Sequence, residues 1–196
     1  MQNDEYQTIS SPSEGLYKEK GSRFLSFAYP VFSVEEAKAI VEQKQKEFHD
    51  ARHHCFAWSI GHSETRMSDD GEPSGTAGKP IFGQILSANL SNILIVVVRY
   101  FGGIKLGTGG LIVAYKTAAA DAIANAQVVL RLYEDIVSFS FPYLSLNDVM
   151  KTIKKSNANI IEQNFDNNCN IKISIRKSDT SNLILKLTDL GCSIIE

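Results

Sequence analysis

The chain has 196 residues, enough for one large or two small domains, and its apolar share of 43% suffices for a hydrophobic core. Its formal net charge of −2 excludes a uniformly basic nucleic-acid-binding protein, so any RNA site must be a local patch. Three widely spaced cysteines, with no Cys-x-x-Cys pair, indicate a reduced cytoplasmic protein rather than a disulfide scaffold or zinc site. No apolar run is long enough to span a bilayer, so we expect no membrane partner.

The first two thirds of the chain predict an N-terminal domain over residues 13–130, preceded by a flexible tail at 1–12. Ser33 and Glu36 form a capping box that starts a helix ending near His49. Alternating and continuous apolar runs predict the strands, and apolar stripes at helical spacing predict the helices. The expected elements in chain order are strands 14–20 and 23–31, helix 34–49, strand 53–60, a polar loop over 62–78, helix 80–88, strand 93–100 and helix 108–126.

The pattern restarts after residue 130 and predicts a second domain over residues 131–196. A strand at 134–141 and a helix around 146–153 precede strands at 160–165 and 170–176, which we expect to be joined at Asp166-Asn167-Asn168. A helix over 183–190 and a short strand at 193–196 complete the order βαββα(β). This order is typical of a small ferredoxin-like domain, so the fold class expected for the whole chain is α+β.

A glycine-rich loop stands between the apolar strand at 93–100 and the helix at 108–126. Such a loop lets backbone N–H groups approach an anion at the helix start, with Lys105 or Thr108 assisting. A dinucleotide fingerprint is absent because Ile112 stands at its third glycine position. The alternative is a tight turn with packing glycines. The five glycines are Gly102, Gly103, Gly107, Gly109 and Gly110.

The second polar cluster is the loop SDDGEPSGTAGKP at residues 68–80. Its carboxylates, Asp69, Asp70 and Glu72, could hold a divalent cation or form a solvated turn, with Thr76 capping the next helix. Ser74 lies between proline and glycine, but nothing in the sequence places a base beside it. Lys79 follows Gly78 as in a phosphate-binding P-loop, yet the neighbouring prolines break that motif.

Arg99 ends the apolar strand, so we expect it to be partly buried and anchored by a carboxylate such as Asp69, Asp70 or Glu72, although phosphate binding is the alternative. Tyr100 could stack on a base or belong to the core. Two adjacent histidines on one strand point to opposite faces, so only one can face a given site. Of these two we assign His54 to the site.

Three segments resemble the signature blocks of the IMPACT/YigZ family: DARHHCFAW at 50–58, SDDGEPSGTAGKP at 68–80 and VVVRYFGGIKLGTGGLIVAY at 96–115. The resemblance implies an N-terminal α/β sandwich like domain four of elongation factor G, and a C-terminal domain related to the last domain of that factor. It also implies a role in translation, because the eukaryotic relatives regulate it. The bacterial members have no settled biochemical function.

Two functions follow as hypotheses, and the residues leave open whether the protein is an enzyme. The first is a non-enzymatic, translation-associated regulator that contacts RNA or the ribosome. The second is an enzyme or sensor for a phosphate-bearing small molecule, bound at the glycine-rich loop. A broad positive sheet face would favour the first, and a closed pocket with carboxylates the second. We expect neither a metal nor a cofactor. The candidate ligand-binding residues are His54, Asp69, Asp70, Glu72, Ser74, Thr76, Lys79, Arg99, Tyr100, Gly102, Gly103, Lys105, Gly107, Thr108, Gly109 and Gly110.

Overall fold

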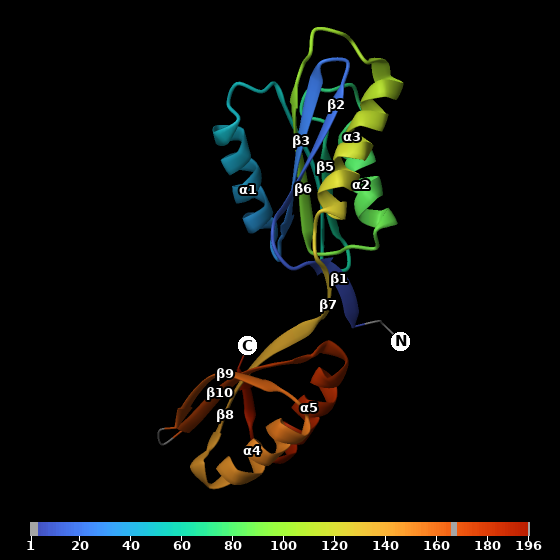
Figure 1. The fold of residues 1–196 in the computed structure, drawn as a ribbon. Coiled ribbons are helices and arrows are strands. Elements are labelled where there is room, and N and C mark those ends of the chain that lie inside the picture. Colours follow the sequence, from blue (N-terminus) through green and yellow to red (C-terminus); the bar gives the residue numbers. More distant parts are fainter. Residues whose placement is uncertain (1–3, 166–167, 196) are drawn as a thin grey trace. The chain divides into compact units, whose positions relative to one another are not determined.

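The computed structural model describes residues 4–165 and 168–195 and contains two compact units (Figure 1). The N-terminal unit is Gln7–Leu130. The C-terminal unit consists of two stretches of described residues, one that ends at Tyr6 and one that begins at Arg131. Both units contain helices and strands, so the expected α+β class is confirmed. The domains 13–130 and 131–196 stay predictions as independently folding parts.

The expected flexible tail is wrong for residues 5–9, which form strand β1 (Glu5–Ile9) and pair with β7 (Val128–Leu132). Ile9 is buried in the core of the N-terminal unit. The backbone of this segment bonds to residues far along the chain, with Ser10 N donating to the Gln127 carbonyl. Local sequence patterns do not predict hydrogen bonds between residues so far apart in the chain.

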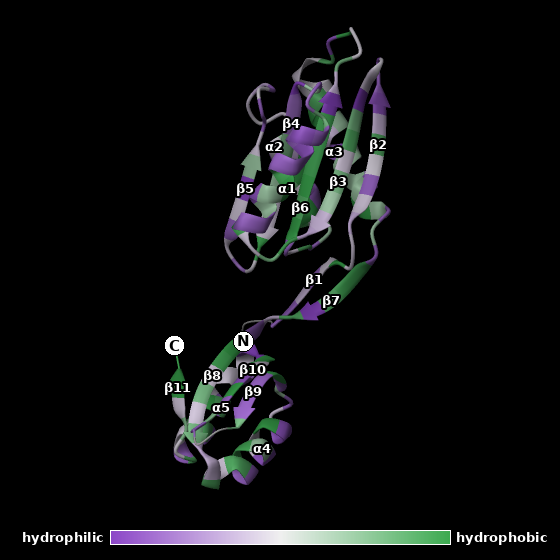
Figure 2. Ribbon diagram, turned by 90° about the vertical axis from the view of Figure 1, so that its left-hand side faces the viewer, coloured by the Kyte–Doolittle hydropathy of each residue, from purple (hydrophilic) through white to green (hydrophobic). Residues whose placement is uncertain are grey.

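The N-terminal unit is built on a five-stranded antiparallel sheet in the order β2–β3–β6–β4–β5. Its central strand β6 is apolar on both faces, which is why it appears as the most hydrophobic strand in Figure 2. The edge strand β5 lies in the first part of the segment that was expected to be a polar loop. The sequence does not predict this strand, because an edge strand with little burial shows no alternating pattern. The strands are β2 Ser13–Glu19, β3 Ser22–Pro30, β4 His53–Ile60, β5 Glu64–Ser68 and β6 Ile93–Tyr100.

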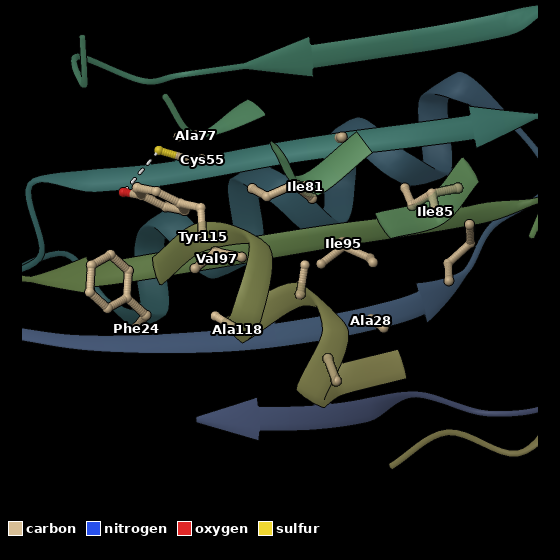
Figure 3. Close-up of a cluster of buried hydrophobic side chains, with 14 of the residues drawn as sticks. Phe24, Ala28, Cys55, Ala77, Ile81, Ile85, Ile95, Val97, Tyr115 and Ala118 are labelled. Carbon is tan, nitrogen blue, oxygen red and sulfur yellow. Dashed lines mark hydrogen bonds between the residues drawn. The ribbon is translucent and has the colours of Figure 1, made fainter. Parts of the chain in front are cut away.

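Helix α1 (Val34–Glu47) covers one face of this sheet, and α2 (Gly78–Ser87) with α3 (Gly107–Ala124) covers the other (Figure 1). The start of α1 is confirmed, since the Ser33 hydroxyl accepts from Glu36 N at 3.1 Å. Strand β4 supplies both cores by alternation: Cys55 packs beneath α2 and α3, and Trp58 beneath α1. Figure 3 shows the first of these cores, where alanines such as Ala118 bring α3 close to the sheet.

The C-terminal unit has a four-stranded antiparallel sheet in the order β11–β8–β10–β9, with two helices over one core. Part of the turn expected at 166–168 lies outside the described residues. No helix in the described part of the chain has both the length and the apolar character that a bilayer span requires. The elements are β8 Glu134–Pro142, the short 3-10 helix η1 Tyr143–Ser145, α4 Leu146–Lys155, β9 Asn159–Phe165, β10 Asn168–Arg176, α5 Lys177–Asp189 and β11 Ser193–Ile195.

Candidate functional site

One hollow of about 760 Å³ lies in the N-terminal unit, where β4 begins, β6 ends and α3 begins. All three sequence blocks contribute to it. Six of the predicted site residues line it: Glu72, Arg99, Tyr100, Lys105, Gly107 and Thr108. The other lining residues are Asp50, Ala51, Arg52, His53, Pro73, Phe101, Leu106 and Leu111.

A buried ion pair lies against this hollow. Arg99 Nη1 donates to Glu72 Oε1 at 2.6 Å, and the Tyr115 hydroxyl donates to the same oxygen at 2.8 Å. The side chains of Arg99 and Glu72 are only 7% and 4% exposed. Arg99 is therefore anchored by a carboxylate, as its place at the end of an apolar strand predicts, and Glu72 is the partner among the three candidates.

The turn that carries Glu72 also orients His53. Asp70 and Gly71 both adopt left-handed backbone conformations, with φ of 40° and 83°. In this turn the Asp70 carbonyl lies 2.8 Å from His53 Nδ1. In the neutral imidazole Nδ1–H donates to that carbonyl, so Nε2 carries the lone pair, 4.0 Å from Glu72 Oε1. His53 thus presents a proton-accepting nitrogen beside the ion pair.

His54 does not line the hollow, and its assignment to the site is corrected. It lies on the α1 side of β4, where Nε2 is 3.1 Å from the Phe48 carbonyl and Nδ1 is 3.7 Å from the Asp70 carboxylate. Its backbone N–H donates to that carboxylate at 2.6 Å. His54 is therefore a buried structural group, and its neighbour His53 takes the place predicted for it.

Asp69 caps helix α2, a role that the sequence reading gave to Thr76. The Asp69 carboxylate accepts from the N–H groups of Gly75, Ala77 and Gly78 at 2.7–2.9 Å. The Thr76 hydroxyl instead donates to the Pro73 carbonyl. Burial acts to raise the pKa of Asp69, but the three N–H donors outweigh it and hold that pKa below its ordinary value.

The three carboxylates of this loop point to different partners, so they do not converge on a cation. Asp69 binds backbone N–H groups, Asp70 binds His54 N and Glu72 binds Arg99. Across residues 4–165 and 168–195 no three His, Cys, Asp or Glu side chains gather as metal ligands would. Ser74 is exposed on the same loop and Lys79 is exposed in the first turn of α2, but neither lines the hollow.

The glycine-rich loop runs along the rim of the hollow, where Lys105 and Thr108 are exposed. Gly102 lies so close to the β2–β3 turn that an added Cβ would meet the Gly21 carbonyl carbon at 1.9 Å. Helix α3 starts at Gly107, and its first turn has no side-chain cap among the described residues. Gly102, Gly103, Gly109 and Gly110 are adjacent to the hollow in sequence but are not part of its lining.

Sequence reasoning missed the side of the hollow formed by the segment before β4. Tyr100 donates to Asp50 Oδ1 at 2.6 Å, a bond that lowers the pKa of Asp50 and raises the pKa of Tyr100. Asp50, Arg52 and His53 all stand within the first family-like block at 50–58. That block is the signal that could have found them.

Cys55 and Tyr115 lie beneath the ion pair and act as neutral groups. The Cys55 thiol is 3.3 Å from the Tyr115 hydroxyl, and Figure 3 shows the two side chains pointing toward each other. Burial raises the pKa of both groups, so the thiol and the hydroxyl stay protonated at neutral pH. Cys55 is therefore not a thiolate nucleophile.

The comparisons with known proteins identify the family. The model of the Impact N-terminal domain matches residues 20–123, a range that contains all three blocks. The chain belongs to the IMPACT family. It is 34% identical over 176 residues to IMPACT family member YigZ of Escherichia coli (strain K12), covering 88% of this chain and 86% of that protein.

Two further relatives extend this likeness over nearly the whole chain. IMPACT family member YvyE of Bacillus subtilis (strain 168) is 31% identical over 187 residues, covering 94% of this chain and 86% of the relative. A crystal structure of a hypothetical protein matches with a TM-score of 0.75 at 30% identity, covering 99% of this chain and 98% of the other. Both units of this IMPACT family protein thus occur together in a solved structure.

Proposed function

We propose that this IMPACT family protein is a cytoplasmic, translation-associated regulator that contacts RNA or the ribosome through the rim of the hollow. The observation that carries the proposal is the composition of that rim. Exposed Arg52 and Lys105 lie on the same hollow as Phe101, whose surface is 55% exposed. Cations bind phosphates and exposed aromatic rings stack on bases, which is the usual pairing at single-stranded RNA sites.

Family membership supports a role in translation, because the resemblance set out from the sequence implies one. The fold adds support of its own. The order βαββαβ of the C-terminal unit and its strand order β11–β8–β10–β9 are what a ferredoxin-like domain requires. We propose on this ground that the C-terminal unit is ferredoxin-like and related to the last domain of elongation factor G, and that the N-terminal unit resembles domain four of that factor.

The interaction with RNA is weak and depends on salt, since the chain carries no net positive charge. Few phosphates can be neutralised, so the cations act in small patches. Lys151, Lys154 and Lys155 form such a patch on one face of α4, at positions i, i+3 and i+4.

Ribosome co-sedimentation at low and high salt tests the proposal. Lys105→Glu should reduce the bound fraction at low salt several-fold and lower the slope of log affinity against log salt by about 1. Lys38→Glu is the matched control, because Lys38 is an exposed lysine on α1, across the sheet from α3. Equal binding by the wild type and both variants at every salt concentration would reject the RNA contact at this rim.

A second function, an enzyme or sensor for a phosphate-bearing small molecule, is favoured by one observation. Glu72 and Arg99 form a buried ion pair on a hollow large enough to enclose a ligand. A free small molecule that binds there, with no ribosome association in any salt, would favour this function over the first.

A further inference from the structure

Gly109 is a glycine that the fold itself does not require. An added Cβ at this position would meet nothing within 4 Å, and its backbone is not in the left-handed region. Two other glycines of the loop, Gly103 and Gly107, have positive φ, and Gly102 is crowded by the β2–β3 turn. A glycine within a helix costs about 1 kcal/mol relative to alanine. Nothing described within the chain compensates that cost at residue 109.

The position of Gly109 indicates that a bound ligand, rather than the fold, explains the glycine. It belongs to the exposed first turn of α3, whose N–H groups have no intrahelical acceptor and no side-chain cap among the described residues. Side chains in a helix lean toward its N-terminus, so a methyl group at 109 would stand beside these N–H groups. A glycine there leaves room for a bound anion to approach the backbone.

The floor of the hollow gives an independent sign of a ligand. Arg99 is 93% buried and lines the hollow, and its Nε has no hydrogen-bond partner in the described part of the chain. All the contacts described for Glu72 involve Oε1, which leaves Oε2 for another donor. His53 Nε2 is a second acceptor beside it. The floor therefore suits hydroxyl groups, which can accept from Arg99 Nε and donate to Glu72 Oε2 or His53 Nε2.

Much of the remaining lining is apolar. It includes Pro73, Phe101, Leu106 and Leu111. A volume of about 760 Å³ is within the range of small-molecule sites. A nucleotide carries a phosphate, a sugar with hydroxyl groups and a flat base, and the first turn of α3, the polar floor and the apolar lining suit these three parts.

We infer that the hollow binds a single nucleotide. Its phosphate lies over the first turn of α3 with Lys105 and Thr108, its hydroxyl groups meet His53 and Glu72, and its base packs against Phe101. The nucleotide comes from one of two sources, free in solution or as part of an RNA strand. Only the second source rests on the RNA contact proposed above.

Titration of the full chain with adenosine monophosphate, inorganic phosphate and a short single-stranded RNA tests the inference, with calorimetry as the readout. Gly109→Ala should raise the melting temperature yet weaken nucleotide binding by about tenfold or more, since the methyl group blocks the N–H groups. Gly83→Ala is the matched control. Gly83 also has open space at its Cβ, but it lies within α2 and not in the first turn of α3. It should raise the melting temperature and leave binding unchanged.

A second variant, Phe101→Leu, tests the nucleotide site without a change in helix α3. Phe101→Leu should weaken the nucleotide and the RNA but not inorganic phosphate, because only the first two carry a base. Comparable affinity for the monophosphate and the RNA assigns the site to free nucleotides, and binding of the RNA alone assigns it to RNA. Unchanged affinity in Gly109→Ala overturns the inference, and so does the absence of binding to all three probes.

The two proposals fail separately. Ribosome co-sedimentation without any nucleotide binding overturns the nucleotide site and leaves the translation role. Nucleotide binding that Gly109→Ala weakens, without ribosome association, supports the site and contradicts that role.

Discussion

The two compact units differ in what they bury. The core of the C-terminal unit consists of apolar side chains and the thiols of Cys169 and Cys192. Among the described polar residues that are buried, only Asp4 belongs to this unit. The N-terminal unit buries His54, Glu72 and Arg99, and these three lie on or next to the strands and turn that frame the hollow.

This difference supports the proposal that the N-terminal unit holds the binding site. A buried ion pair often stabilises a protein no more than an apolar pair of the same size, because both charges lose their hydration. The N-terminal unit nevertheless keeps Arg99 and Glu72 together where the three family blocks meet. The C-terminal unit has a smaller hollow of about 400 Å³ beside α4 and α5, but the charged residues that line it are exposed. Its core is packed in the ordinary apolar way.

Removal of one buried charge should have the largest effect. Arg99→Met leaves Glu72 without its cation and should destabilise the N-terminal unit by about 3–5 kcal/mol, measured by urea denaturation. The matched variant in the C-terminal unit is Arg176→Met, which breaks two pairs, one of Arg176 Nε with Asp4 at 3.2 Å and one of Arg176 Nη2 with Glu5 at 3.8 Å. Arg176 is 42% exposed, and Asp4 keeps its bond from Ser178 N. The loss in free energy of unfolding for Arg176→Met should stay below about 1 kcal/mol. Equal losses for the two variants would contradict the difference between the units.

The helix starts of the two units should differ by a smaller amount. Asp69→Asn weakens three N–H contacts at the start of α2 and should cost about 1–2 kcal/mol. Asp148→Asn in the first turn of α4 changes an exposed carboxylate and should cost a few tenths of a kcal/mol. A larger loss for Asp148→Asn would show that Asp69 does not hold the 68–80 loop.

The same carboxylate predicts an acid sensitivity. The pKa of Asp69 is lower in the folded protein than its ordinary value of 3.8, so the folded state favours the ionised form. This stabilisation is complete above pH 3.8 and is lost as the pH falls through the lowered folded-state pKa. Stability curves from pH 6 to about pH 2 should therefore decline less steeply for Asp69→Asn than for the wild type. Parallel curves would show that another group causes the decline.

The lysines of α4 should affect stability least. Reversal of Lys151, Lys154 and Lys155 to glutamate should cost less than about 1 kcal/mol, because the helix face is exposed and its one described ion pair is 3.4 Å long. Ribosome co-sedimentation should nevertheless fall if both units contact RNA. Unchanged co-sedimentation, in a variant with a native circular dichroism spectrum, would restrict the contact to the N-terminal unit.

Much of the fold could be predicted because its signals are local. The capping box at Ser33, the apolar run of β6 and the β2–β3 hairpin all have the predicted positions, apart from a residue or two at their ends. Strand β1 and the edge strand β5 were missed, since long-range pairing rather than side-chain periodicity defines them.

The sequence by itself determined the family, through three blocks, and the need for a carboxylate beside Arg99, because a charge at the end of an apolar strand must be paired. Only the tertiary structure decided that Glu72 is that carboxylate and that Asp69 caps α2. It also decided that His53, not His54, faces the hollow. Period-two alternation places two neighbours on opposite faces of a sheet, but which face holds a site depends on the helices packed there.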